Sequence, residues 1–434
     1  MPSADVVVVG SGLAGLTCAV QLAERGARVV VVAAGHATLT WAAGPLDVAA
    51  PPEALTSRDG IEHLARLAGH PYAVVAEDAA PAVGWFSALA NRGGLPYHGD
   101  LDRPFRPLPT ALGALRRVGL VPGGMAAALP PWGRDERLVV VGLAGFKDLW
   151  PAAAAAGLRL AYASADGPGP ARISGLNVAL PNLAGRRNLS ALDLARAFDR
   201  PAERRAMLRR VAAALEAHAA GPRRVALPAV LGLEDHAAAL AETADALGGP
   251  VFEVPLVPPS IPGLRLHALL RRAFLRLGGR VLMGEAVARV ELTAGGVARV
   301  VVPAAARETA IAVTRLVLAT GGLAGGGLVA EPDGRIRESV LGLPVVAPPV
   351  DDWLAADAFA PGGHPIAAAG LATDGRLRPL GGPHGAAADA PLLAGVWAIG
   401  GLLAGQRVVR ERCGDGVALA SAWRVAGQAA EAAA

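Results

Sequence analysis

Residues 5–35 read DVVVVGSGLAGLTCAVQLAERGARVVVVAAG, and this stretch decides the fold. Two runs of valine, residues 6–9 and 29–32, stand on either side of a glycine-rich turn and an apolar segment. Continuous apolar runs are typical of parallel strands that are buried on both faces. The stretch therefore predicts a strand, a tight turn, a helix and a second, parallel strand.

The turn has the spacing G-x-G-x-x-G, with glycines at Gly10, Gly12 and Gly15. In a dinucleotide-binding unit the first glycine makes the turn, the second lets backbone approach a phosphate, and the third lets helix and strand pack closely. The helix N-terminus adds amide donors and a positive dipole. We therefore expect a bound nucleotide. However, the second strand ends at Ala33 and Ala34, where such units carry the acid that binds the adenosine ribose.

The composition is that of a globular chain. With 434 residues, 53% of them apolar and 18% charged, it is long enough for two or three domains. A net charge of +4 without aromatic residues among clustered arginines indicates no nucleic-acid partner. Two cysteines without metal-site spacing predict a reduced, cytoplasmic protein with no bound metal. The uncharged segment 6–23 predicts a buried strand and helix, and neither a transmembrane helix nor a signal peptide is expected.

Changes of pattern along the chain predict two domains. Residues 36–75 form an irregular segment with Gly and Pro punctuation. Residues 76–255 contain further strand-like runs and an amphipathic helical segment, which predict an inserted α/β domain. Residues 256–434 return to the first domain with a helix, a β-hairpin, buried strands and a last helix. The predicted fold is thus a doubly wound, Rossmann-like α/β domain of residues 1–75 and 256–434 that carries the insertion.

Three later glycine clusters favour flavin over nicotinamide. Residues 319–322 read ATGG after a buried strand, residues 398–401 read AIGG after another, and residues 414–416 read GDG before the last helix. A hairpin precedes the first of these clusters, as it does in flavin-binding folds of the glutathione reductase type. Two helix N-termini directed at one extended cofactor would explain why glycine clusters so far apart occur in the same chain.

The whole chain resembles the B subunit family of anaerobic glycerol-3-phosphate dehydrogenases. The resemblance rests on stretches from the first strand to the last helix: VVGSGLAGLTCAVQLAERG, AAGPLD, PPSIPGLRL, GGLVAEPDGRIRESVLGLPV, GLATDGRLRP and WAIGGLLAG. Many flavoproteins share the dinucleotide elements, whereas PPSIPGLRL and GGLVAEPDGRIRESVLGLP are the discriminating ones. The family is more distantly similar to fumarate reductase flavoproteins.

The resemblance implies a respiratory complex of three subunits. An A subunit, similar to flavin dehydrogenases, would oxidise glycerol 3-phosphate to glycerone phosphate, and a C subunit would carry iron–sulfur clusters and the membrane contact. The B subunit would bind FMN and help to pass electrons toward quinone. The chain would then be cytoplasmic, at the inner face of the membrane through its partners.

The missing acid at Ala33 favours FMN, which has no adenosine ribose, over FAD. FAD stays open as the alternative, with Glu24 or Asp47 as the group that would hold the ribose. We expect these residues to bind the flavin: Gly10, Ser11, Gly12, Leu13, Ala14, Gly15, Ala33, Gly44, Val287, Thr320, Gly321, Gly322, Gly400, Gly401, Gly414, Gly416 and Val417.

Candidates for substrate binding and proton transfer are fewer. Arg265, Arg337 and His364 are the catalytic candidates, with Arg335 as a further possible cation for the substrate phosphate. Each is also an ordinary position for a surface or ion-paired side chain. Asp415 is expected either to point away from a phosphate or to hold a ribityl hydroxyl, because an acid beside a phosphate repels it.

Two other groups of residues have a structural and a functional interpretation. Cys18 and Cys413 are expected to be buried packing residues, with a thiol near the flavin as the alternative. The arginines at 204, 205, 209 and 210 are expected to form a solvated helix face, with a docking surface for a partner protein or anionic lipid as the alternative.

Two other functions remain open beside that of a respiratory flavoprotein. One is a free-standing FAD-dependent oxidoreductase of the fumarate reductase or ketosteroid dehydrogenase type. The other is a structural subunit that keeps its glycine turns without binding flavin. The respiratory flavoprotein subunit is the leading interpretation, although similarity of fold alone does not choose among the three, because chemistry belongs to sites rather than to folds.

Overall fold

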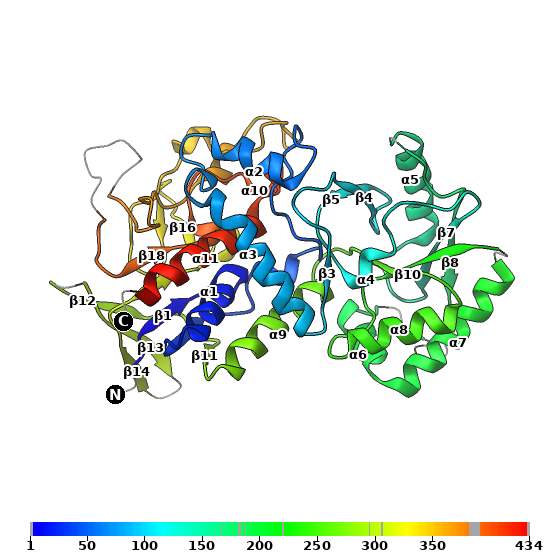
Figure 1. Ribbon diagram of the computed structural model, residues 1–434, viewed down its shortest axis with the longest axis horizontal. Coiled ribbons are helices and arrows are strands. Elements are labelled where there is room, and N and C mark those ends of the chain that lie inside the picture. Colours follow the sequence, from blue (N-terminus) through cyan, green and yellow to red (C-terminus); the bar gives the residue numbers. More distant parts are fainter. Residues whose placement is uncertain are drawn as a thin grey trace. The chain divides into compact units, whose positions relative to one another are not determined.

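The computed structural model describes residues 3–165, 167–180, 183, 185–186, 188–218, 221–294, 296–304, 307–381 and 391–431. The chain forms two compact units (Figure 1). Unit 1 comprises residues 1–39, 47–89 and 267–434, and unit 2 comprises residues 40–46 and 90–266. Each unit has a parallel sheet of its own.

Unit 1 is built on a five-stranded sheet with the order β11-β2-β1-β15-β18. All four pairings are parallel, so the carboxyl ends of the strands lie at one edge. The strands are β1 (Val6–Val9), β2 (Val29–Ala33), β11 (Arg280–Met283), β15 (Leu316–Leu318) and β18 (Val396–Ala398). The two valine runs lie side by side in register, from Val6 beside Val29 to Val9 beside Val32. Both runs are buried along their whole length, as a sheet covered on both faces requires.

The helices of unit 1 include a tightly packed pair. Helices α1 (Leu13–Glu24) and α11 (Gly414–Glu431) lie side by side in Figure 1. Ten consecutive residues of α1, Leu13 to Leu22, are buried, which explains why this segment lacks charge. The other helices are α2 (Ser57–Ala65), α3 (Tyr72–Arg92), α9 (Ile261–Arg276) and α10 (Val408–Glu411), of which α3 and α9 continue into unit 2.

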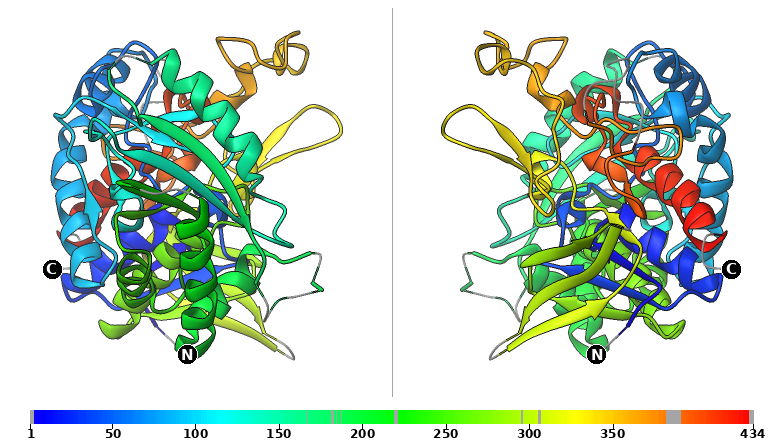
Figure 2. Two further views of the ribbon diagram at one scale, coloured as in Figure 1. Left: turned by 90° about the vertical axis from the view of Figure 1, so that its right-hand side faces the viewer. Right: turned by 90° about the vertical axis from the view of Figure 1, so that its left-hand side faces the viewer.

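Two small antiparallel sheets complete unit 1. Strands β12 (Arg289–Thr293), β13 (Gly296–Ala304) and β14 (Arg307–Ala312) form the first, and β16 (Leu328–Ala330) pairs with β17 (Ile336–Glu338) in the second. Figure 2 shows the first as a yellow-green layer distinct from the blue strands of the parallel sheet. The predicted hairpin before β15 is therefore present. Residue 295 of its turn lies outside the described residues.

Unit 2 contains a four-stranded parallel sheet with the order β10-β9-β7-β8. These strands are β7 (Arg137–Leu143), β8 (Arg172–Val178), β9 (Arg223–Pro228) and β10 (Val251–Val254). The accompanying helices are α4 (Gly123–Ala126), α5 (Pro151–Ala163), α6 (Ala191–Asp199), α7 (Pro201–His218) and α8 (His236–Leu247). Two short antiparallel pairs are formed by β3 (Tyr97–His98) with β6 (Val121–Pro122) and by β4 (Arg106–Pro109) with β5 (Leu115–Val118). The buried side chains of these elements form a core of their own.

The predicted α/β class with doubly wound parallel sheets is confirmed. The expectation that residues 36–75 are irregular is wrong for α2 and for the start of α3. Helix α2 begins with a capping box, in which Thr56 and Asp59 each accept a hydrogen bond from the other's backbone amide. The division into residues 1–75 with 256–434 and 76–255 stays a prediction, and its first boundary falls inside α3.

Within the part of the chain that the structure describes, every helix is too short or too polar to cross a lipid bilayer.

Candidate functional site

The glycine turn between β1 and α1 is shaped by close backbone contacts. Gly10 has φ of +117°, and a Cβ there would lie 2.2 Å from the carbonyl oxygen of Ala319. A Cβ on Gly15 would lie 2.0 Å from the carbonyl oxygen of Gly10. Both positions therefore require glycine, because any side chain would force β1, β15 and α1 apart.

Gly12 is different, because a Cβ there would meet only the Cβ of Ala37, at 3.5 Å. Gly12 is the N-cap of α1, and it offers no side chain to the amides of the first turn. The first turn also has no acidic residue. A helix cannot satisfy these amides internally, so this N-terminus keeps free donors and an uncompensated positive dipole. That is the arrangement that binds a phosphate.

The later glycine clusters lie at the same edge of the sheet. A Cβ on Gly400 would lie 2.7 Å from the Cβ of Ala14 in α1, and one on Gly322 would lie 2.8 Å from the carbonyl oxygen of Gly401. The residue after Ala319 is Thr320, whose hydroxyl is buried without a hydrogen-bond partner. The turns after β1, β15 and β18 thus converge, and an orphaned donor lies where they meet. In open α/β sheets this carboxyl edge is where ligands bind.

Comparisons with known proteins agree with this geometry. The family described as "FAD binding domain" matches residues 5–417. The B subunit of anaerobic glycerol-3-phosphate dehydrogenase from Pectobacterium carotovorum is 34% identical, over 98% of this chain and 98% of that protein. The chain belongs to this B subunit family. A probable B subunit of the same enzyme from Halobacterium salinarum is also 34% identical, over 99% of this chain and 98% of that protein.

Among solved structures, the FrdA chain of Escherichia coli quinol fumarate reductase is similar at 10% identity with a TM-score of 0.42, over 99% of this chain and 71% of that one. The family membership makes this chain a flavoprotein of the oxidoreductase type and one subunit of a larger assembly. The sequence-based predictions of family, fold and flavin are therefore confirmed.

The position of the ribose-binding acid is occupied by small residues in this member of the family. Ala33 is the last residue of β2 and is buried, and Ala34 and Gly35 follow it as exposed residues. Glu24 is excluded as a replacement, because it lies at the far end of α1, about 18 Å from Gly12 at 1.5 Å per residue. There it accepts a hydrogen bond from the indole of Trp85 at 2.9 Å.

The N-terminus of α11 is engaged by protein groups, which differs from the prediction of a second helix terminus facing the cofactor. The backbone amides of Asp415 and Gly416 both donate to the carbonyl oxygen of Asp47, at 3.1 and 3.2 Å. The Asp415 carboxylate accepts from the amide of Asp47 at 2.8 Å. Asp47 also pairs with Arg412 at 2.8 Å. Asp415 and Asp47 thus fasten α11 to the loop after residue 46, and both carboxylates are engaged by protein groups.

Several predicted flavin contacts serve packing in the structure. A Cβ on Gly416 would lie 2.1 Å from the hydroxyl of Tyr72, and one on Gly414 would lie 2.4 Å from Val408. Gly44, with φ of +109°, belongs to unit 2, where a Cβ would lie 2.8 Å from Met125. Three further predicted contacts have these places: Ser11 and Val417 are buried, and Val287 is half-buried between β11 and β12. Their contacts with flavin stay predictions.

Arg265 is held in a buried ion pair. Its guanidinium donates to both carboxylate oxygens of Glu253, at 2.6 and 2.9 Å, and to the carbonyl oxygen of Gly232 at 2.7 Å. Arg265 and Glu253 are 4% and 1% exposed, so a substrate phosphate would have to displace a buried carboxylate. Burial raises the pKa of Glu253, but Arg265 outweighs this effect and holds the pKa below its usual value. The catalytic role of Arg265 stays a prediction.

The other two catalytic candidates lie on the surface of unit 1. Arg337 is exposed on β17 and pairs with Glu331 at 2.6 Å. His364 is half-buried, and its Nδ1 accepts a hydrogen bond from the amide of Ala355 at 3.1 Å. These partners lie outside the glycine turns, so the catalytic roles of Arg337 and His364 stay predictions. Arg335 is likewise exposed and pairs with Asp333.

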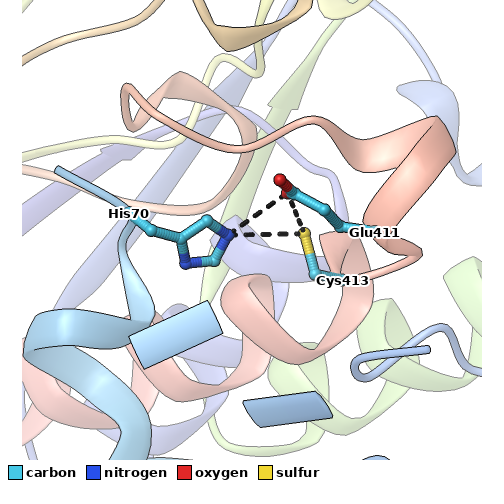
Figure 3. Close-up of side chains that lie close together, drawn as sticks. All are labelled: His70, Glu411 and Cys413. Atoms are coloured by element: carbon cyan, nitrogen blue, oxygen red, sulfur yellow. Dashed lines mark hydrogen bonds and ion pairs between the residues drawn. The ribbon is translucent and has the colours of Figure 1, made fainter. Parts of the chain in front are cut away.

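A buried cluster of His70, Glu411 and Cys413 was not foreseen from the sequence (Figure 3). Nε2 of His70 lies 3.3 Å from Oε2 of Glu411, and Sγ of Cys413 lies 3.5 Å from the same oxygen. The amide of Tyr72 donates to Nδ1 of His70, so the imidazole proton is on Nε2 and is given to Glu411. The amide of Arg407 donates to the same carboxylate oxygen at 2.6 Å.

Three donors therefore converge on one oxygen of Glu411, which ties α10 to the residues that precede α3 and α11. A metal ion would need Nε2 of His70 without its proton and would compete with all three donors. Burial raises the pKa of Glu411, but the hydrogen bonds from His70 and from the Arg407 amide outweigh this and lower it. Burial and the nearby Glu411 raise the pKa of the Cys413 thiol well above its usual value.

The remaining predictions concern Cys18 and the arginines of α7. Cys18 is fully buried in α1, and burial raises the pKa of its thiol to about 12, as expected for a packing residue. The prediction of a solvated arginine face is wrong for Arg204, which is 4% exposed and pairs with Glu242 at 2.6 Å. It holds for the exposed side chains of Arg205, Arg209 and Arg210.

Proposed function

We propose that this chain is the flavin-carrying B subunit of a dehydrogenase complex that oxidises glycerol 3-phosphate to glycerone phosphate and passes the electrons toward quinone. A flavin dehydrogenase A subunit and an iron–sulfur C subunit would be its partners, and they would bring it to the inner face of the membrane. The support is the 34% identity, over 98% of this chain, to a protein named as the B subunit of anaerobic glycerol-3-phosphate dehydrogenase.

The observation that carries a flavin role for this chain is the convergence at the carboxyl edge of the unit 1 sheet. The uncapped N-terminus of α1, the turn after β15 and the turn after β18 meet there, with glycine wherever a Cβ would close the gap. The orphaned hydroxyl of Thr320 adds a donor at the same edge. The uncapped helix N-terminus and the unpartnered hydroxyl fit a phosphorylated, polar cofactor.

FMN is the proposed form of the cofactor, with FAD as the alternative. The end of β2 carries Ala33, Ala34 and Gly35, none of which can accept hydrogen bonds from a ribose through a side chain. FMN makes no such demand, because its chain ends at the phosphate. A flavin bound at this edge would accept a hydride or single electrons.

The residues of this chain bind and orient that group rather than form an evident acid–base set. The amides of α1 would hold the phosphate and Thr320 would offer a hydroxyl. Gly322 and Gly401 let the turns after β15 and β18 approach each other. His364 and Arg337 remain the proposed proton-transfer and phosphate-binding residues for a substrate that reaches this chain.

The deciding experiment is purification of the chain with and without its partner subunits, followed by release and chromatography of the flavin. Bleaching of the flavin absorbance by glycerol 3-phosphate would then be recorded. We expect bleaching only with the A subunit present. Bleaching and turnover with an artificial acceptor by the isolated chain would favour a free-standing oxidoreductase, and a colourless chain after reconstitution would favour a structural role.

A further inference from the structure

The loop after β2 turns back onto the phosphate-binding turn. The hydroxyl of Ser11 donates to the carbonyl oxygen of Gly35 at 3.0 Å. Two residues later, Ala37 lies 3.5 Å from the Cβ position of Gly12, with its backbone at a φ of +60°. His36 lies between these two contacts and is exposed. The backbone of His36 therefore follows the turn at the N-terminus of α1, just beyond the place of the missing acid.

A second histidine lies against His36. The ring of His267, on α9, is 5.5 Å from the ring of His36, and the two planes meet at 77°. His267 is only 5% exposed, and its Nε2 is buried without a hydrogen-bond partner. Buried imidazole nitrogens normally have a partner, because losing the hydrogen bond with water costs free energy. The described residues therefore supply no hydrogen-bond partner for Nε2 of His267, and a bound polar group could fill that place.

The charges around His267 indicate which kind of group is missing. Burial, the neighbouring His36 and then Arg271 lower the pKa of His267 to about 4. Arg271 follows His267 by one turn of α9 and is exposed. Within the described residues, none of these three side chains has an ion pair with a carboxylate. The two histidines in ring contact and the arginine one turn after His267 thus have no carboxylate partner among the described residues.

We propose that His36, His267 and Arg271 bind the terminal phosphate of the flavin nucleotide beside the N-terminus of α1. The inference rests on the proposed flavin function and makes it more specific. In place of the acid that binds a ribose, the site would then have basic residues, and these would contact the phosphate at the end of FMN. A phosphomonoester carries a charge of about −1.5 to −2 at pH 7 and three acceptor oxygens, so it fits several donors at once. The adenosine of FAD would have to occupy the same space as these three side chains.

The test is a titration of the apoprotein with FMN, riboflavin and FAD, in which the quenching of flavin fluorescence measures binding. Riboflavin has the same ring and ribityl chain but no phosphate. We expect the unaltered chain to bind FMN about 100-fold more tightly than riboflavin, and His36→Ala and Arg271→Ala each to weaken FMN binding about tenfold. Riboflavin affinity should not change in either variant.

Arg276→Ala is the matched control, because it removes one exposed positive charge from the same helix, one and a half turns further on. It should leave the affinity for FMN unchanged. His267→Gln adds a readout independent of affinity, since the phosphorus-31 resonance of bound FMN should shift in this variant and not in Arg276→Ala. Glutamine keeps a polar side chain of similar length in the buried position.

The outcomes separate this inference from the flavin function itself. Equal affinities of the unaltered chain for FMN and riboflavin, or tighter binding of FAD than of FMN, would overturn the phosphate site and leave the flavin site standing. An equal loss of FMN and riboflavin affinity in His36→Ala and Arg271→Ala would also overturn it. If the unaltered chain binds none of the three flavins, the flavin function itself is overturned.

Discussion

The Cβ position of Gly400 lies 2.7 Å from the Cβ of Ala14, so the turn after β18 touches the first turn of α1. These residues are almost four hundred positions apart in the chain, and their contact brings two glycine clusters to one edge of the sheet. The backbone of Gly400 has φ of +66°, which a side chain adopts only with strain. A side chain at position 400 should therefore disturb this contact.

Gly400→Ala should lower the free energy of unfolding by about 1–3 kcal/mol, through the strained backbone and the collision with Ala14. Thermal unfolding of the apoprotein measures this directly. Ala418→Gly, at a buried position of α11 that also borders Gly400, controls for a general loss of packing. An unfolding midpoint of Gly400→Ala equal to that of the unaltered chain would contradict the contact.

Gly12→Ala and Gly15→Ala should separate binding from folding. A Cβ on Gly12 meets no close atom, so the apoprotein should keep its stability while the flavin content falls. A Cβ on Gly15 would lie 2.0 Å from the carbonyl oxygen of Gly10, so this variant should be destabilised as well. Unfolding midpoints and bound flavin per chain measure the two effects. Full flavin content in Gly12→Ala would contradict the phosphate site at α1.

The tie between His70 and Glu411 should be visible in the pH dependence of stability. The pKa of Glu411 is lowered in the folded chain, so its contribution is present above the unfolded pKa, near 4.3, and is lost as the pH falls below it. Glu411→Gln should cost about 2–4 kcal/mol at pH 7 and should reduce this acid sensitivity. Urea unfolding at pH 7 and at pH 4 measures it. An acid sensitivity of the variant equal to that of the unaltered chain would contradict the assignment.

His267 should produce a second pH effect in the apoprotein, at higher pH. Its pKa of about 4 in the folded chain lies below the unfolded value of about 6.5, because of burial, His36 and Arg271. The unfolded chain therefore binds the proton first, and stability should decline by about 1–2 kcal/mol, after solvent screening, as the pH falls from 6.5 to 4. His267→Gln should abolish that part of the decline. His63→Gln, at an exposed position on α2, is the control.

The buried ion pair of unit 2 should behave as structure rather than as catalysis. Arg265→Ala leaves Glu253 buried and unpaired, so it should lower the free energy of unfolding by about 3–5 kcal/mol. Arg265→Met with Glu253→Gln removes both charges, and it should restore much of the stability and the dehydrogenase activity of the assembled complex. A stable double variant that is inactive in the complex would instead return Arg265 to the catalytic candidates.

The parts of the fold that could be predicted from the sequence are those fixed by neighbouring residues. The valine runs and the G-x-G-x-x-G spacing identify β1, α1 and β2, because burial on both faces and the tight turn leave a local pattern. Helix α2 was missed because its signal is a single capping box, Thr56 with Asp59, in a stretch rich in Gly and Pro.

The site was predicted less completely, because its side chains meet through the fold. His36 and His267 come from loops and helices more than two hundred residues apart, and so do His70 and Glu411. The burial of Arg265 and Arg204 depends on Glu253 and Glu242, whose positions no spacing reveals. The amides of α11 are taken by Asp47, a partner that the GDG sequence before that helix does not indicate.

We propose that this chain holds a flavin that ends at its phosphate beside the N-terminus of α1. The most direct measurement is chromatography of the flavin released from the purified chain, together with the ratio of flavin to protein. We predict FMN, at about one molecule per chain. Release of FAD at that ratio would contradict the phosphate end of the site, and a chain without flavin after reconstitution would contradict the claim as a whole.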